Sequence, residues 1–221
     1  MTTLEAIDKI DFFNTLNDTQ KLSLENISTL RTFSKNTIVY YEDDIDYSLQ
    51  FLVSGVVKIY KIDKFNNEIF LYNIYSGNMI SEFSSLDSDS IYCFSNAQFS
   101  EDGQMLSVNF EKFKKLFIDT AILVQPFIQE ILSKTNKLQY IINRELVFDA
   151  TAKVSFLISN DLTIINKLKR VQIAFMLHIQ PETLSRVLKK LTKNNIISIE
   201  DNQINIIDGE RLSSCFIGIG R

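Results

Sequence analysis

The segment at residues 181–191 (PETLSRVLKKL) carries side chains whose types could read DNA bases. The sequence predicts a helix that starts at Gln180 or Pro181 and buries its leucine and valine positions. The opposite face carries polar side chains at three- and four-residue steps: Glu182, Ser185, Arg186 and Lys189. Arginine can donate two hydrogen bonds to guanine, glutamate can accept one from cytosine, and serine can bond a base or a phosphate. This face could enter a major groove, or Glu182 and Arg186 could simply pair on the helix surface.

The neighbouring segments would position that face. Residues 170–177 and 181–193 are predicted to form two short helices joined by a turn, and the basic character of the second is typical of a helix-turn-helix. Residues 196–208 then predict two strands around a turn, a hairpin of the kind called a wing. His178 lies in the turn, at a position that commonly needs a positive φ, which histidine tolerates better than most residues. We therefore interpret His178 as structural.

Charge is distributed unevenly along the chain. The net charge is −4, but residues 1–148 carry 13 Lys and Arg against 20 Asp and Glu, whereas residues 149–221 carry 10 against 7. Within residues 167–193, seven basic side chains face the single acid Glu182. Such a basic segment favours a polyanionic partner, with a solvated helix surface as the alternative.

Composition excludes several other classes of protein. One histidine and two cysteines leave too little material for a zinc site, a Ser-His-Asp constellation or a disulfide framework. We expect no metal site and no catalytic residues, because an enzyme that used Cys93 or Glu82 would lack a paired base. The sequence shows neither a secretion signal nor a long apolar run, so we expect no membrane insertion and a cytoplasmic location.

The expected fold class is α+β. Residues 4–30 predict two short helices, and the short β-rich runs from Phe33 to about Asn109 predict an antiparallel β-roll of the cupin-like jelly-roll kind. A long helix without Gly or Pro follows Pro126, and the winged helix-turn-helix comes last. The expected domains are a sensor at 1–125, a dimerisation helix at 126–148 and a DNA-binding domain at 149–221.

The long helix carries an apolar seam that favours a homodimer. Its members recur at three-, four- or seven-residue steps: Ile128, Ile131, Thr135, Leu138 and Ile142. This spacing is closer to a coiled coil than to the broad buried face of a globular helix. The alternative is that the helix packs against its own roll.

Three segments resemble the Crp/Fnr family of bacterial transcription regulators. The helix-turn-helix segment carries the family's E-x-x-S-R at Glu182, Ser185 and Arg186. Residues 52–58 (LVSGVVK) and 75–82 (YSGNMISE) are similar to signatures of its cyclic-nucleotide-binding fold. The resemblance implies a two-fold dimer that binds double-stranded DNA at a palindromic, TTGA-type site, with RNA polymerase as a further partner. It also places Arg170 and Lys169 at phosphate-contacting positions, and Gln180 beside the base-reading residues.

The sensor departs from the family pattern. Tyr92 and Cys93 stand where cyclic-nucleotide binders have an Arg-Ser pair, and Leu138 stands where they have a threonine. Cyclic AMP is therefore not the expected effector, although Glu82, Tyr92, Cys93 and Leu138 remain the candidate pocket. No cysteine cluster precedes Phe33 to hold an iron–sulfur cluster.

The effector stays open. A haem would need Cys93, Met79, Met105 or an unusual ligand. A free cysteine in a β run is more often a small buried hydrophobe than a redox switch. An alternative reading of the whole chain is a ligand- or haem-binding sensor or scaffold whose helix-turn-helix does not function.

Overall fold

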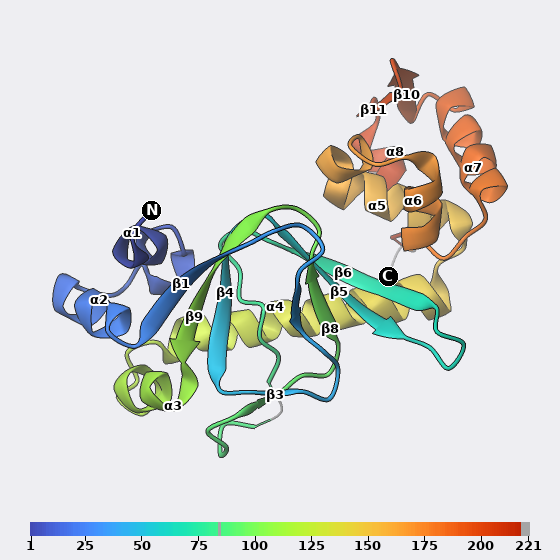
Figure 1. Cartoon of the computed structure of the whole chain (residues 1–221). Helices are drawn as coiled ribbons and strands as arrows, with labels where there is room; N and C mark the ends of the chain where they lie inside the picture. The colour runs from blue at the N-terminus through green and yellow to red at the C-terminus, as the bar shows by residue number, and fades with distance from the viewer. Residues whose placement is uncertain (84, 218–221) are drawn as a thin grey trace. The chain divides into compact units, whose positions relative to one another are not determined.

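The structure divides into two compact units, Met1–Lys137 and Leu138–Arg221. It is a computed structural model and describes residues 1–83 and 85–217. The first unit holds the antiparallel sheets and the second holds the helix-turn-helix (Figure 1), so the predicted α+β class is confirmed. The boundary between the units falls inside the long helix α4 (Val124–Ile142).

Short capped helices open the first unit. α1 (Thr3–Asp8) and α2 (Asp18–Glu25) each begin with a capping box, in which an N-cap side chain and the third helical residue exchange hydrogen bonds with backbone N–H groups. A 3₁₀ turn, η1 (Asp11–Phe13), lies between them. The expectation of helix up to residue 30 was wrong, because Leu30 already pairs with Leu106 in the first strand.

Among the residues of this unit that the structure describes, nine strands form three antiparallel sheets. They are β1 (Ser28–Phe33), β2 (Ile38–Tyr40), β3 (Ile45–Asp46), β4 (Ser48–Ser54), β5 (Val56–Ile62), β6 (Glu68–Tyr75), β7 (Ile91–Tyr92), β8 (Asn96–Phe99) and β9 (Gly103–Asn109). The sheet orders are β1-β9-β4, β2-β8-β5-β6 and β3-β7. α3 (Phe110–Phe113) and the π-helical turn η2 (Lys114–Ile118) connect the last strand to α4.

Strand β4 separates two apolar cores. Successive side chains of a strand point to opposite faces, so Phe51 and Leu52 enter different clusters. Phe51 packs against Phe12 and Phe13 of η1, with ring centroids 5.1 and 4.8 Å away. These contacts fix the N-terminal helices to one end of the roll (Figure 1).

The turn between β4 and β5 requires glycine. Gly55 has φ +91°, and a Cβ there would lie 2.8 Å from the carbonyl oxygen of Asp102. Gly77 has a similar φ of +88° but open space around it. We expect Gly55→Ala to lower the free energy of unfolding by about 2 kcal/mol or more, against about 1 kcal/mol for Gly77→Ala. Urea denaturation measures both, and equal losses would contradict the steric argument.

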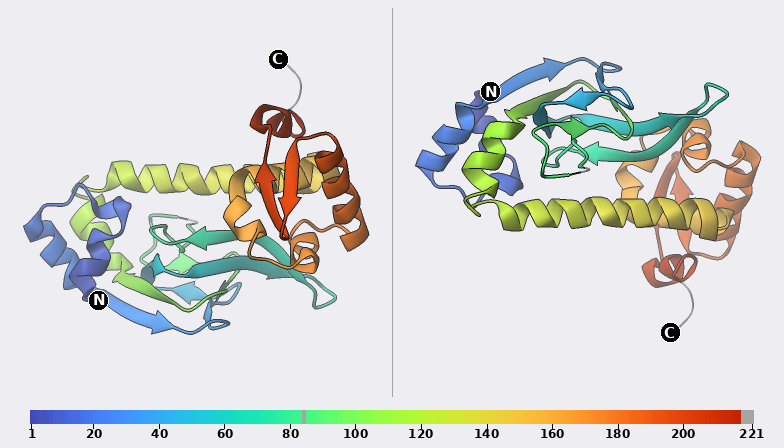
Figure 2. Two further views of the ribbon diagram at one scale, coloured as in Figure 1. Left: turned by 90° about the horizontal axis from the view of Figure 1, so that it is seen from above. Right: turned by 90° about the horizontal axis from the view of Figure 1, so that it is seen from below.

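The second unit is mainly helical. It contains the π-helical turn η3 (Asn143–Val147), α5 (Ala150–Ile165), α6 (Arg170–Met176), α7 (Pro181–Lys193), β10 (Ile197–Glu200), β11 (Gln203–Ile206) and α8 (Gly209–Ser214). Figure 2 shows β10 and β11 as a hairpin. Helix α5 has a kink at Asp161, which leaves helical geometry. Among the described residues, no helix has the length and apolar character needed to cross a membrane.

Candidate nucleic-acid interface and sensor site

Helix α7 buries one face and exposes the other, as the sequence predicts. Its buried side chains are Leu184, Val187, Leu188 and Leu191. The polar candidates on the opposite face are all exposed: Glu182, Ser185, Arg186 and Lys189. The Arg186 guanidinium donates to Thr183 Oγ1 at 3.1 Å, and no ion pair between described residues joins it to Glu182. The surface pairing considered as an alternative is therefore not formed.

The turn before α7 sets where that face begins. His178 has φ +52°, which confirms the predicted left-handed conformation. Gln180 is the extended N-cap residue and Pro181 is the first helical residue, where its missing N–H leaves no donor unsatisfied. Ser185 Oγ donates back to the carbonyl oxygen of Pro181 at 3.0 Å.

A hollow of about 560 Å³ lies between α7 and the hairpin. Its charged lining is entirely basic, and the lining residues are Arg170, Ser185, Leu188, Lys189, Thr192, Lys193, Ile199 and Asn202. Lys169 is exposed at the N-cap of α6, and burial lowers the pKa of the half-buried Arg170 without removing its charge. This surface has the charge and polarity that suit a phosphate backbone.

The candidate pocket residues of the sensor fall in both units, with Glu82, Tyr92 and Cys93 in the first and Leu138 in the second. The Glu82 carboxylate already accepts from the Phe94 N–H at 2.9 Å and from Ser95 Oγ at 3.0 Å. Cys93 is buried, and burial followed by nearby Asp46 raises the pKa of its thiol to about 12. Tyr92 is 37% exposed and bonds the Asp43 carboxylate, while Leu138 belongs to the second unit.

Comparisons with known proteins agree with both halves of this description. A Crp-like helix-turn-helix domain matches residues 153–215 and a cyclic nucleotide-binding domain matches residues 30–120, which together make up more than half of the chain. The chain belongs to the Crp/Fnr family. The anaerobic regulatory protein of Bacillus subtilis is 26% identical over 191 residues, which cover 81% of this chain and 79% of that protein. This Crp/Fnr protein is therefore a DNA-binding transcription regulator.

Solved structures show the same fold. A variant of CooA from Carboxydothermus hydrogenoformans aligns with a TM-score of 0.71 and 16% identity, covering 97% of this chain and 95% of that one. FixK2 from Bradyrhizobium japonicum gives 0.66 and 18%, covering 88% and 100%. The relatives that match are transcription regulators rather than enzymes.

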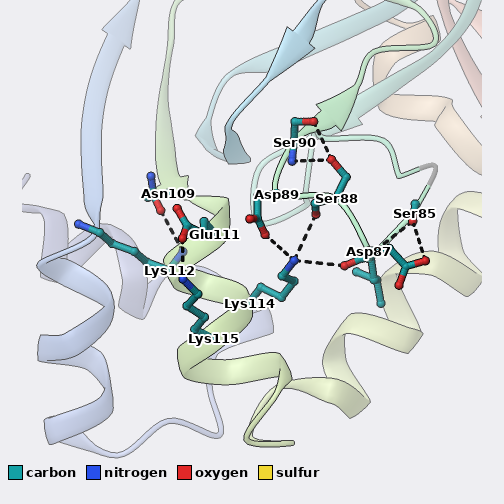
Figure 3. Close-up of polar contacts among 11 residues, drawn as sticks. Ser85, Asp87, Ser88, Asp89, Ser90, Asn109, Glu111, Lys112, Lys114 and Lys115 are labelled. Atoms are coloured by element: carbon teal, nitrogen blue, oxygen red, sulfur yellow. Dashed lines mark hydrogen bonds and ion pairs between the residues drawn. The ribbon is translucent and has the colours of Figure 1, made fainter.

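An acidic loop follows Glu82 in this Crp/Fnr sensor. Lys114 reaches into residues 85–90, where its Nζ lies 2.5 Å from Asp89 Oδ1 and donates to the carbonyl oxygens of Leu86 and Ser88 at 3.3 and 3.4 Å (Figure 3). The loop thus presents carbonyl and carboxylate oxygens to the ammonium group of Lys114. Such oxygens repel a phosphate.

The apolar seam of α4 is exposed. Ile128, Ile131, Leu138 and Ile142 have exposed fractions between 38% and 54%, and Thr135 is exposed beside them. Leu132, which the predicted seam did not include, is 56% exposed on the same side of the helix. It could have been found from its four-residue step after Ile128.

Sequence reasoning also missed Lys134, whose ammonium lies against the roll. Its Nζ donates to the carbonyl oxygens of Met79 and Ile80 at 2.9 and 3.4 Å, and none of the ion pairs among described residues includes it. Burial lowers the pKa of Lys134 to about 8, and Lys137 adds to the decrease.

This lysine makes stability depend on pH. The unfolded chain, with a lysine pKa of about 10.4, binds more protons than the folded chain between pH 8 and that value, so stability rises with pH in this window. We expect Lys134→Met to raise the free energy of unfolding at pH 7 by about 1–3 kcal/mol and to lose that advantage towards about pH 10. Urea denaturation against the exposed Lys9→Met control measures it. If the gain in the free energy of unfolding of Lys134→Met grew with pH, this account would be contradicted.

Proposed function

We propose that this regulator acts as a homodimer that reads a palindromic, TTGA-type site. The observation that carries the proposal is the exposed polar face of α7, on which Glu182, Ser185 and Arg186 follow directly from an ordered turn. In this proposal the two α7 helices enter successive major grooves about 34 Å apart. Arg186 reads guanine, Glu182 reads cytosine, and Gln180 and Ser185 contact the adjoining bases or phosphates.

Basic residues around that face would fix the position of the DNA. Lys169, Arg170 and Lys189 are assigned to phosphates, because they lie on or beside the hollow between α7 and the wing. Contacts of this kind give affinity without sequence preference.

Dimerisation would use the exposed seam of α4. The apolar side chains of the seam on α4 expose too much apolar surface to water for a long helix without a partner. A second copy of the chain would cover this surface. We further propose that the dimer works in the cytoplasm, where it would meet both chromosomal DNA and RNA polymerase.

The effector of the sensor is proposed to be neither cyclic AMP nor an iron–sulfur cluster. The Lys114-held loop and the side chain of Tyr92 offer no guanidinium to a cyclic phosphate. The side chains that could ligate a haem iron are also poorly suited to it. Met79 and Met105 are buried in apolar cores, and the Cys93 thiol is held in its neutral form. An uncharged organic ligand, or action without an effector, fits these residues better.

Salt-dependent DNA binding tests the proposed function. The probe is a duplex of about 30 base pairs with two inverted TTGA half-sites one helical turn apart, and the control is a scrambled duplex. We expect tighter binding to the palindrome, with log K falling about 5 units per unit of log salt for six phosphate contacts, three from each copy. A sensor or scaffold with an inactive helix-turn-helix would bind neither duplex.

An absorption spectrum of protein purified from haem-replete cells tests the sensor proposal. We expect no Soret band. A stoichiometric band would overturn the argument from the buried sulfur ligands.

A further inference from the structure

The carboxylate of Glu145 is the centre of a polar cluster in the second unit. Arg144 Nε donates to Glu145 Oε1 at 2.6 Å, and His178 Nδ1 lies 3.0 Å from Glu145 Oε2. Lys153 Nζ is 3.8 Å from the same oxygen. Burial alone would raise the pKa of Glu145, but hydrogen bonds from His178 and Arg144 outweigh it and lower that pKa, so the group is ionised at neutral pH.

Both ends of the Glu145–His178 contact are fixed. Arg144 is 1% exposed, and η3 continues directly from α4. His178 stands two residues before the N-cap of α7, in the left-handed conformation described above. Its Nε2 is buried without a hydrogen-bond partner among the described residues, so the bond to Glu145 orients the ring.

The contact therefore joins the end of α4 to the turn that precedes α7. Lys153 of α5 adds a second tie, since its Nζ donates to the carbonyl oxygen of Leu177 at 3.3 Å. These ties restrain the turn from which α7 begins.

We propose that Glu145 and His178 are positioning residues for DNA recognition and that their contact makes DNA affinity increase as pH falls. This proposal rests on the proposed function of α7. Histidine changes charge between about pH 5 and 8, and a protonated imidazole binds a carboxylate more strongly than a neutral one. The charged groups facing the ring are Glu145 and Arg144 from η3 and Lys153 from α5. Of these groups, the Glu145 carboxylate is the one in direct contact with the ring.

The test compares the full-length wild type with Glu145→Gln and His178→Asn, because asparagine tolerates a positive φ. Binding to the inverted TTGA duplex is measured by fluorescence anisotropy at pH about 6 and about 8. We expect the wild type to bind the duplex about two- to five-fold more tightly at the lower pH. Both variants should bind it equally tightly at the two pH values. Glu210→Gln, at an exposed position of α8, is the control and should keep this difference. An unchanged ratio in both variants overturns the proposal.

A second measurement does not depend on DNA. The chain has one histidine, so the imidazole N–H bonded to Glu145 should give a single downfield proton resonance, which Glu145→Ala removes. A resonance that survives this change overturns the contact. If the wild type shows the resonance yet prefers neither duplex, the proposed base reading fails and the positioning role fails with it, while the contact stands.

Discussion

Arg186→Ala should reduce affinity for the palindromic duplex by about ten-fold to a hundred-fold per half-site. The Arg186 side chain is exposed on α7 and donates a hydrogen bond to Thr183. Its removal leaves the buried face of the helix intact, so the free energy of unfolding should stay within about 0.5 kcal/mol of the wild-type value. Competition binding against the scrambled duplex measures the loss of specificity.

Two matched variants separate base reading from simple loss of charge. Arg211→Ala removes the same side chain from α8, where it lies 4.0 Å from Asp208, and should leave both affinities unchanged. Lys189→Ala should weaken binding to both duplexes alike and reduce the salt slope. If Arg186→Ala behaves as Lys189→Ala does, the assigned base contact is wrong.

Leu138→Glu should convert the proposed dimer to monomers. A two-fold interface along α4 would bury the introduced carboxylate from each copy, at a cost of about 3 kcal/mol or more, so the dimer dissociation constant should rise at least a hundred-fold. Monomers lose the second half-site, and palindrome binding should fall with them. Sedimentation velocity measures the association state directly.

Asn136→Glu provides the matched control for charge. Asn136 is exposed on α4 but lies off the apolar seam, so the same carboxylate there should leave the dimer intact. Dimers that persist in Leu138→Glu would mean that the seam faces another surface.

The local features of the DNA-binding unit were predictable from the sequence. The bounds of α7 match the predicted 181–193, and the positive φ of His178 follows from its place in a short turn. Such features depend on periodicity and turn chemistry, which neighbouring residues determine.

The features that the sequence did not reveal depend on distant partners. Lys134 meets carbonyl oxygens more than 50 residues away, and Lys114 holds a loop that precedes it by 24 residues or more. The first residues of strand β1, up to Leu30, were predicted as helix, but the pairing of this strand with β9 overrides that weak local pattern. The helical pattern of a sequence does not predict whether the amine of a lysine faces water or backbone carbonyl oxygens.

The placement of the unit boundary inside α4 has a consequence for unfolding. The exposed seam draws Ile128 and Ile131 from the first unit and Leu138 and Ile142 from the second. A partner helix that covers the whole seam would be bound by both units, so neither could melt without releasing it. Calorimetry of the proposed dimer should then show one concentration-dependent transition, and Leu138→Glu should remove its dependence on concentration.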